Sequence, residues 1–520
     1  MRSMGNCKTR SNVLYYYTLK KQSAQSKMRR RTFMKAVSGL LENLDYRIIK
    51  GEAGGQISAL VYDSRKVTKD CMFVCIQGAV YDSHEHVEEI TAKGARVIVA
   101  EREVEVPAGV TLVLVSDTRY TLALLSAAYF DYPARKLKVI GITGTKGKTT
   151  TTYMVKGILE HAGYRVGLIG TIETIIGDTH IPANNTTPES YVIQEYFSQM
   201  AAAGCQICVM EVSSQGLMMH RTAGIPFEIG IFTNLAPDHI GPNEHASFEE
   251  YAECKGRLFR QCRMGIANVD DEHFDLVMQG HTCTMETIGF SGQADYRASD
   301  VELIGRPGYL GVRYHICGKL DMDVEIDVPG IFSVYNSLSA VAVCEHFNVS
   351  EEDLKEALKV VKTKGRIEMI QVSEDFILMI DYAHNAMSLQ SLLLTLKEYH
   401  PKRLVCVFGC GGNRAKLRRY EMGEVSGRLA DLTVITSDNP RFEEPQAIID
   451  DIKVGMARTS GDYVEISDRK EAIRYVIEHG QKGDVIVLAG KGHEDYQEIK
   501  GRKYPMDERE LIREVLEELG

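Results

Sequence analysis

The sequence predicts an α/β protein of three domains, built around a central parallel sheet that carries a phosphate-binding loop. The chain has 520 residues, 44% of them hydrophobic and 25% charged, which is enough for about three domains that each bury a core. Short apolar runs alternate with helical patterns in two series, an order typical of parallel sheets covered by helices. We therefore expect a smaller mixed α/β domain first, then the central domain, then a Rossmann-like domain.

The predicted domain boundaries fall at two breaks in this pattern. Tyr132-Pro-Ala-Arg-Lys interrupts regular structure before the first series, and Lys364-Gly-Arg precedes the second. The predicted domains are therefore residues 34–135, 136–365 and 366–520.

Residues 1–33 form a basic leader that lies outside these domains. Ten basic residues and no acidic residue precede Glu42. This composition resembles that of a targeting peptide, and the alternative is an over-long translation start, with the protein beginning near Met28 or Met34. We favour the second interpretation because the leader lacks a clean apolar core.

The charge and the cysteines limit the partners and the compartment. With 61 Lys and Arg residues against 71 Asp and Glu residues, the net charge of −10 argues against a nucleic-acid partner. No apolar run approaches the ~18 residues that span a bilayer, so we expect no membrane partner. The twelve cysteines show no zinc-ribbon spacing, and free buried cysteines imply a reducing compartment. We expect a cytoplasmic protein.

Eight apolar runs are the predicted strands of the two larger sheets. Those of the central domain are Val139-Ile-Gly-Ile-Thr, Val166-Gly-Leu-Ile, Ile207-Cys-Val-Met and Ile229-Gly-Ile-Phe. Those of the C-terminal domain are Ile377-Leu-Met-Ile, Leu404-Val-Cys-Val-Phe, Leu432-Thr-Val-Ile and Val485-Ile-Val-Leu. After the first strand, helical spacing predicts a helix with an apolar face of Met154, Val155, Ile158 and Leu159.

The strongest functional signal lies between that first strand and that helix. In Gly141-Ile-Thr-Gly-Thr-Lys-Gly-Lys-Thr-Thr, glycines let backbone N–H groups approach phosphates, and the helix N-terminus favours negative charge. Lys148 can reach the terminal phosphates and the Thr149 hydroxyl can bind Mg²⁺, although Ile142 occupies the usual first-glycine position. We predict an ATP site at Gly144, Thr145, Lys146, Gly147, Lys148, Thr149 and Thr150.

Acidic residues follow two other predicted strands of the central sheet. Glu211 ends a buried strand, and in open α/β sheets ligands bind beyond the carboxyl ends of strands. A carboxylate there can hold Mg²⁺, and the alternative role for Glu211 is to cap a helix. Asp238-His239 follows a third strand and could join the same metal cluster.

Together these motifs and five others resemble the Mur ligases of peptidoglycan synthesis. The motifs are Gly144-Thr-Lys-Gly-Lys-Thr, Asn185-Thr-Thr-Pro, Met210-Glu-Val-Ser-Ser, Asn234-Leu-x-x-Asp-His, the helix around Lys255, Tyr335-Asn336, Gly365-Arg366 and Asp381-Tyr-Ala-His. They occur in family order over nearly the whole body of the chain. Asp438-Asn-Pro-Arg441 and Gly490-Lys-Gly-His-Glu494 are similar to the signature of the diaminopimelate-adding branch.

The resemblance implies three substrate sites. It places a UDP-sugar in domain 34–135, with UDP-MurNAc-dipeptide contacts at Ser64, Arg65, Thr186, Thr187, Ser213, Gln215 and Arg221. It adds Asn336, Arg366 and His384 to the ATP site. It implies diaminopimelate contacts at Arg414, Asp438, Asn439, Pro440, Arg441, Gly490 and Glu494, with Arg441 pairing with the distal carboxylate and Glu494 with the distal ammonium.

The resemblance also implies the catalytic and metal-binding groups. Spacing alone would put Lys255 on a solvated helix face, but the family carries a carbamylated lysine at the matching position, which supplies an anionic ligand for a second Mg²⁺. The implied catalytic residues are Lys148, Glu211, His239 and carbamylated Lys255, and the implied metal ligands are Thr149, Glu211, His239 and Lys255.

The implied activity is that of an ATP-dependent amide ligase. It would add meso-diaminopimelate to UDP-N-acetylmuramoyl-L-alanyl-D-glutamate through an acyl phosphate, using ATP and Mg²⁺, and we expect a monomer. Departures from the family pattern at Asn385, Asn413 and Ala415 leave two alternatives open. One is a related ligase with another acceptor, such as lysine, glutamate or a cyanophycin-type substrate. The other is a non-catalytic nucleotide-binding paralogue.

Overall fold

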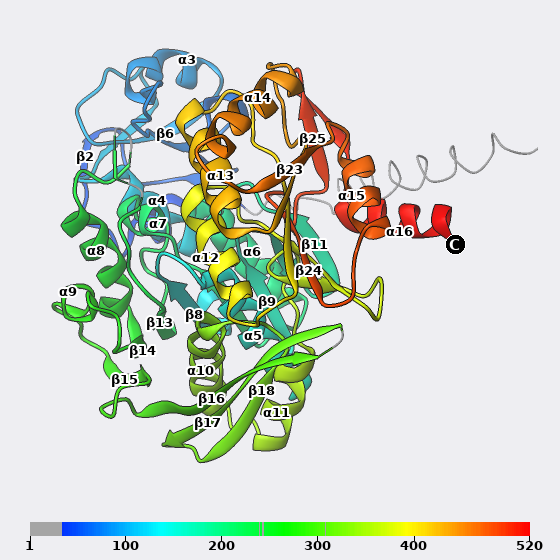
Figure 1. The fold of residues 1–520 in the computed structure, drawn as a ribbon. Helices are drawn as coiled ribbons and strands as arrows, with labels where there is room; N and C mark the ends of the chain where they lie inside the picture. Colours follow the sequence, from blue (N-terminus) through cyan, green and yellow to red (C-terminus); the bar gives the residue numbers. More distant parts are fainter. Residues whose placement is uncertain (1–33, 239, 242–243, 307) are drawn as a thin grey trace, which may run out of the picture. The chain divides into compact units, whose positions relative to one another are not determined.

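The computed structural model describes residues 34–238, 240–241, 244–306 and 308–520 (Figure 1). The predicted leader 1–33 and the predicted metal ligand His239 lie outside the described residues. The chain divides between Tyr129 and Phe130 into two compact units. The predicted domain boundaries at 135 and 365 stay predictions.

The first unit contains a mixed sheet of five strands in the order β2-β7-β6-β5-β4. Its strands are β2 (Arg47–Lys50), β4 (Leu60–Val61), β5 (Cys71–Val74), β6 (Ala95–Ala100) and β7 (Thr111–Leu114), and a separate pair joins β1 (Lys35–Ala36) to β3 (Gln56–Ile57). The sheet strands run parallel except for β2, which pairs antiparallel with β7. The helices of this unit are α2 (Val37–Leu41), α3 (Val87–Ala92) and α4 (Thr118–Tyr129).

The central sheet has eleven strands among the described residues, in the order β11-β10-β9-β12-β8-β13-β14-β15-β16-β17-β18. The middle strands are β8 (Lys138–Thr143), β9 (Val166–Ile169), β12 (Ile207–Glu211), β13 (Phe227–Phe232), β14 (Cys262–Asn268) and β15 (Thr284–Gly289). They pair in parallel, and β8, β9, β12 and β13 are buried along nearly their whole length, which explains their continuous apolar sequence. The predicted parallel sheet is confirmed.

Antiparallel strands extend this sheet at both edges, which the strand pattern of the sequence does not predict. They are β10 (Glu173–Ile176) and β11 (Thr179–Pro182) on one side, and β16 (Tyr296–Arg306), β17 (Tyr309–Gly318) and β18 (Met322–Ile326) on the other. Of these, β16 pairs in parallel with β15 and antiparallel with β17. Many of their side chains alternate between buried and exposed, as expected for a sheet with one solvated face.

Helices cover the central sheet. They are α5 (Lys148–His161), α6 (Ser190–Ala202), α7 (Ser214–Met218), α8 (Phe248–Gly256), α9 (Phe274–Met278), α10 (Ile331–Glu345) and α11 (Glu351–Val360). The apolar face predicted for α5 is confirmed, since Met154, Val155, Ile158 and Leu159 are all buried in one core with side chains of α10. Packing of α5 fixes the helix N-terminus at the end of β8.

The C-terminal sheet has six strands among the described residues, in the order β19-β20-β24-β21-β22-β23. They are β19 (Glu368–Ile370), β20 (Ile377–Asp381), β21 (Arg403–Phe408), β22 (Leu432–Ile435), β23 (Asp462–Glu465) and β24 (Asp484–Ala489). All but the β19–β20 pair are parallel, and the four predicted strands are confirmed as β20, β21, β22 and β24. The loops after these strands therefore lie at one edge of the sheet.

Five helices and a small hairpin complete this part of the chain. They are α12 (Ala386–Lys397), α13 (Lys416–Leu429), α14 (Pro445–Met456), α15 (Arg469–Glu478), α16 (Glu508–Leu519), and the strands β25 (Tyr496–Ile499) and β26 (Arg502–Pro505). Within the described residues, none of the helices has the length and apolar character needed to cross a membrane.

Candidate active site

The loop between β8 and α5 needs glycine at two positions. Gly144 has a φ of +147°, and a Cβ placed there would lie 2.0 Å from the Thr233 hydroxyl oxygen. Gly147 has a φ of +84°, and its Cβ would lie 2.5 Å from Oδ1 of Asn336. The Nζ of Lys148 donates to the carbonyl oxygens of Gly144 and Thr145, both at 2.9 Å. The loop is thus a tight backbone turn held by its own lysine.

Glu211 is a fully buried carboxylate beside this loop. It accepts hydrogen bonds from the Thr149 hydroxyl at 3.0 Å, from the Thr171 hydroxyl at 2.9 Å and from the Thr171 backbone N–H at 2.8 Å. Glu211 is the last residue of β12, and Thr171 follows the end of the neighbouring strand β9. The strand-end rule that identified Glu211 could also have identified Thr171, which the sequence analysis missed.

Lys255 is buried, contrary to what helical spacing alone suggests. Its side chain is on α8, and its Nζ donates to the carbonyl oxygen of Gly144 at 2.8 Å and lies 4.4 Å from the centre of the Tyr251 ring. Burial, followed by the positive charge of Lys148, holds the pKa of Lys255 well below its usual value. Both effects favour the uncharged form of this amine next to the phosphate-binding loop.

A cavity of about 800 Å³ brings most of the predicted ATP residues together. Its lining includes Thr145, Lys146, Gly147, Lys148, Thr149, Thr150, Asp238, Asn336, Arg366 and His384, together with Glu211. Gly144 is not part of the lining, although its carbonyl accepts from both Lys148 and Lys255. Residues of the second apolar series thus face the phosphate-binding loop across one cavity.

Arg366 offers an unused donor in this cavity. Its guanidinium lies 4.9 Å from the centre of the Tyr382 ring, and in the described part of the chain its Nε is buried without a hydrogen-bond partner. Buried donors are rarely left unpaired, and an anionic oxygen is the strongest partner for a guanidinium. The cavity therefore suits an anionic ligand such as a nucleotide.

A second cavity of about 330 Å³ contains the central-domain residues predicted to bind the dipeptide. Its lining includes Thr186, Thr187, Ser213, Gln215 and Arg221, and it shares Lys148 and Thr171 with the first cavity. The two cavities therefore adjoin at the phosphate-binding loop.

The remaining predicted dipeptide residues, Ser64 and Arg65, belong to the first unit. They begin a short 3-10 helix there, and Arg65 is paired with Asp63, its Nε donating to Oδ1 at 2.9 Å.

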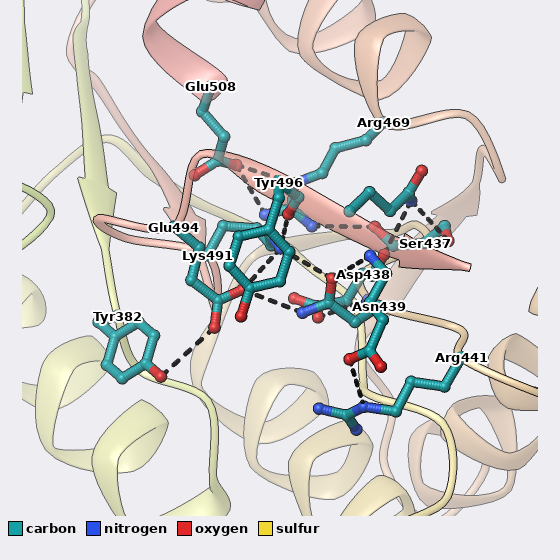
Figure 2. Close-up of polar contacts among 12 residues, drawn as sticks. Tyr382, Ser437, Asp438, Asn439, Arg441, Arg469, Lys491, Glu494, Tyr496 and Glu508 are labelled. Carbon is teal, nitrogen blue, oxygen red and sulfur yellow. Dashed lines mark hydrogen bonds and ion pairs between the residues drawn. The ribbon is translucent and has the colours of Figure 1, made fainter. Parts of the chain in front are cut away.

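The predicted acceptor residues lie in the loops after three strands of the C-terminal sheet (Figure 2). Asp438, Asn439, Pro440 and Arg441 follow β22, Gly490 and Glu494 follow β24, and Arg414 lies exposed after β21. The Nδ2 of Asn439 donates to Oε2 of Glu494 at 2.9 Å, and Nη1 of Arg441 donates to the carbonyl oxygen of Gly412 at 2.7 Å. These bonds join the three loops.

Comparison with known proteins identifies the family. The Mur ligase middle domain matches residues 142–344, and the Mur ligase glutamate ligase domain matches residues 365–492. A UDP-N-acetylmuramoyl-L-alanyl-D-glutamate–2,6-diaminopimelate ligase of Caldanaerobacter subterraneus subsp. tengcongensis is 42% identical over 472 residues, covering 90% of this chain and 97% of the relative. The chain belongs to the Mur ligase family. It is an ATP-dependent amide ligase, as Mur ligases are.

Other Mur ligases and related folds agree with this assignment. A relative of the same description from Clostridium acetobutylicum is 42% identical over 484 residues, covering 92% of this chain and 99% of the relative. A solved structure of a UDP-N-acetylmuramoyl-L-alanyl-D-glutamate–2,6-diaminopimelate ligase matches with a TM-score of 0.70 at 28% identity, over 94% of this chain and 99% of that one. A folylpolyglutamate synthase of Mycobacterium tuberculosis, with a TM-score of 0.56 at 16% identity over 72% of this chain and 92% of its own, shares the fold alone.

Two of the three departures from the Mur ligase pattern, Asn385 and Asn413, have local structural roles. Asn385 caps α12, because its Oδ1 accepts from the backbone N–H of Ser388 at 2.9 Å. Asn413 has a φ of +54°, which asparagine tolerates, and its Oδ1 accepts from the backbone N–H of Phe442 at 3.1 Å. Ala415 directly precedes α13. The loops of this Mur ligase accommodate all three residues.

Proposed function

We propose that this Mur ligase adds meso-diaminopimelate to UDP-N-acetylmuramoyl-L-alanyl-D-glutamate at the expense of ATP. The observation that carries the proposal is the pair of adjoining cavities that share Lys148 and Thr171, one suited to a nucleotide and one to a peptide carboxylate. The printed function of relatives 42% identical over about nine-tenths of the chain supports the same substrates.

The reaction needs two steps because a carboxylate is a poor electrophile. The γ-carboxylate oxygen of the D-glutamyl residue attacks the terminal phosphorus of ATP, the bond to ADP breaks, and an acyl phosphate forms. The acceptor amine then attacks the acyl carbon, and the tetrahedral intermediate loses phosphate and a proton to give the amide. No covalent bond to the protein is required, so positioning and charge carry the rate.

The residues at the first cavity fit this chemistry. Lys148 and the N-terminus of α5 would bind the phosphates, and Arg366 would supply its unpaired Nε to an anionic oxygen. Asn336 is buried against Gly147 and holds the Thr151 hydroxyl at 3.2 Å, which supports the turn of the loop. His384 lies in the same lining.

The hydroxyl of Thr149 and the buried carboxylate of Glu211 fit a magnesium ion, which prefers oxygen ligands. Mg²⁺ bound there would neutralise charge on the phosphates. His239 and Lys255 are the other proposed ligands. The lowered pKa of Lys255 favours its uncharged amine. That amine can attack carbon dioxide and release a proton, and the resulting carbamate carries the negative charge that a metal ligand needs.

The acceptor preference is supported by charges after β22 and β24. We propose that the guanidinium of Arg441 pairs with the distal carboxylate of diaminopimelate, which lysine lacks, and that Glu494 pairs with the distal ammonium. Asp438, Asn439, Pro440, Gly490 and Arg414 would complete this site. We further propose that the protein acts as a monomer in the cytoplasm.

Product analysis tests the proposal directly. The full chain is incubated with ATP, Mg²⁺, UDP-MurNAc-L-Ala-D-Glu and one amino acid at a time, with phosphate release and product mass as readouts. We expect turnover with meso-diaminopimelate and little with lysine or glutamate. Equal turnover with lysine would reject the proposed acceptor, and nucleotide binding without turnover by any amino acid would favour a non-catalytic paralogue.

A further inference from the structure

Lys491 is a buried lysine between the two loops that carry the predicted acceptor residues (Figure 2). Its Nζ donates to Oε2 of Glu494 at 2.7 Å, to Oδ1 of Asn439 at 3.1 Å and to the carbonyl oxygen of Tyr496 at 2.5 Å. A lysine ammonium has three N–H donors, so all three are used inside the protein. Lys491 therefore acts on other side chains and has no donor left for a substrate.

The partners of Lys491 are themselves linked. The Nδ2 of Asn439 donates to the same Glu494 oxygen at 2.9 Å, and Oδ1 of Asn439 also accepts from the backbone N–H of Glu498 at 2.8 Å. Lys491, Asn439 and Glu494 thus form a closed triangle of hydrogen bonds. The triangle fixes the relative orientation of two predicted acceptor contacts that come from different loops.

A second buried cation, Arg469, bonds to the backbone where these two loops begin. Nη1 of Arg469 donates to the carbonyl oxygen of Ser437 at 3.2 Å, Nη2 donates to that of Ala489 at 3.1 Å, and Nε donates to Glu508 at 2.8 Å. These carbonyls lie at the start of the two loops. Arg469 therefore fixes where the loops begin, and the direction of the side chains beyond that point depends on Lys491.

We propose that Lys491 is a positioning residue of the acceptor site, whose ammonium holds Asn439 and Glu494 in the orientation that binds the amino-acid acceptor. The inference rests on the proposed function, because it takes the acceptor to be diaminopimelate with its distal ammonium on Glu494. It adds a residue to which neither the family resemblance nor the cavities assign a role.

The charge of Lys491 also keeps Glu494 ionised. Burial raises the pKa of Glu494, but the charge and hydrogen bond of Lys491, with the bond from Asn439, outweigh it and leave the pKa below its usual value. The other groups that face this carboxylate are the Tyr382 hydroxyl at 3.5 Å and His493. Burial lowers the pKa of His493 to about 4, so it is uncharged near neutral pH. Without Lys491, Glu494 would take up a proton as the pH falls.

Steady-state kinetics of Lys491→Met and Lys491→Gln test this role. We expect Lys491→Met to raise the KM for diaminopimelate roughly tenfold to a hundredfold, since a hydrogen bond to a charged group is lost, while the KM for ATP is unchanged. Lys491→Gln keeps an amide group that can donate hydrogen bonds but carries no charge. Its KM for diaminopimelate should lie between that of Lys491→Met and that of the unmodified protein. The kcat/KM for diaminopimelate should decline in Lys491→Met as the pH falls, over a range in which that of the unmodified protein stays level, because Glu494 then takes up a proton more readily.

Two further measurements separate positioning from a general loss of structure. Hydroxylamine can replace the acceptor: its nitrogen bonds to the acyl carbon, the bond to phosphate breaks, and a hydroxamate forms without the acceptor site. We expect Lys491→Met to keep this hydroxamate formation. The matched control is Lys470→Met, which removes ion pairs to Glu514 and Glu518 on the same part of the chain and should leave all KM values unchanged.

The outcomes distinguish the two proposals. An unchanged KM for diaminopimelate in Lys491→Met, or equal loss of hydroxamate formation and amide formation, overturns the role of Lys491. Failure of the unmodified protein to use diaminopimelate overturns the proposed function, and with it the acceptor on which this role depends. Should Lys491→Met not fold, the KM of Lys491→Gln decides.

Discussion

At the phosphate-binding loop, Lys148 and Lys255 both donate to backbone carbonyls of one short segment. Beyond β22 and β24, by contrast, the charged side chains are paired with one another. In the described part of the chain, neither lysine of the nucleotide side forms an ion pair, so neither amino group is held by a carboxylate and both can act on ligands. On the acceptor side, Arg441 is already bonded to Glu498 and Lys491 to Glu494. Substitutions on the nucleotide side should therefore change kcat, and substitutions on the acceptor side should change the KM for diaminopimelate.

Lys148→Met should have the largest effect. Removing the ammonium takes away a charge that stabilises the phosphate transferred in the first step, so we expect kcat to fall roughly 10²- to 10³-fold. Phosphate release measured at saturating substrates gives this value. Lys156→Met, on the same helix and paired with Glu160, is the control and should retain normal kcat. If Lys148→Met instead raised only the KM for diaminopimelate and left kcat unchanged, the nucleotide side and the acceptor side would not differ in the way we expect.

Lys255→Ala should follow, with a loss of roughly 10²-fold in kcat. If the active group is a carbamate, bicarbonate cannot restore the alanine variant, because the amine that would be carbamylated is absent. A short carboxylic acid such as formate or acetate should restore part of the activity by replacing the missing anion. Rates measured with and without added acid check this. Full activity without any addition would dismiss the carbamate.

The same contrast explains what the sequence could predict. The ATP-loop residues are contiguous and follow a strand, so a single motif identified them, and continuous apolar runs identified β20, β21, β22 and β24 as strands. The burial of Lys255 was out of reach, because helical spacing shows which face a residue occupies but not what packs against that face.

Contacts between distant loops were also out of reach. The strand-end rule could have marked Thr171 as a candidate, but its contact with Glu211 requires the strand order, in which β9 and β12 are neighbours. Lys491 stands inside a recognised motif, yet its partners Asn439 and Tyr496 come from the other loop and from β25. The antiparallel edges of the central sheet are different, because their strands form hairpins with short turns, as where Ile176 lies opposite Thr179. Such turns are a local signal, which the sequence analysis missed.

Arg441→Ala tests the acceptor side of the contrast at a partly exposed charge. Loss of the guanidinium should raise the KM for diaminopimelate roughly tenfold to a hundredfold and leave the KM for ATP within about twofold. Arg513→Ala, which removes a surface arginine paired with Glu510 and Glu517, should change neither value. An equal rise in both KM values would mean that Arg441 supports the whole active site and not the acceptor alone.

Glu498→Gln should give the smallest effect, and in the opposite direction. Nε of Arg441 donates to Oε2 of Glu498 at 3.0 Å, and both side chains are partly exposed. The Glu498 carboxylate offsets part of the positive charge of Arg441, with which the distal carboxylate of diaminopimelate would pair. An amide oxygen can still accept the Nε–H bond and keep Arg441 in place, but it carries no charge.

The KM for diaminopimelate should therefore fall in Glu498→Gln by about twofold to fivefold, the range of a partly exposed ion pair. Lysine has no distal carboxylate and should gain nothing, so the preference for diaminopimelate over lysine should widen by the same factor. Glu498→Asp keeps the charge and serves as the control for loss of the side chain's length. A rise in the KM for diaminopimelate in Glu498→Gln would show that the carboxylate itself binds the acceptor, most simply through its distal ammonium, and would move that role from Glu494 to Glu498.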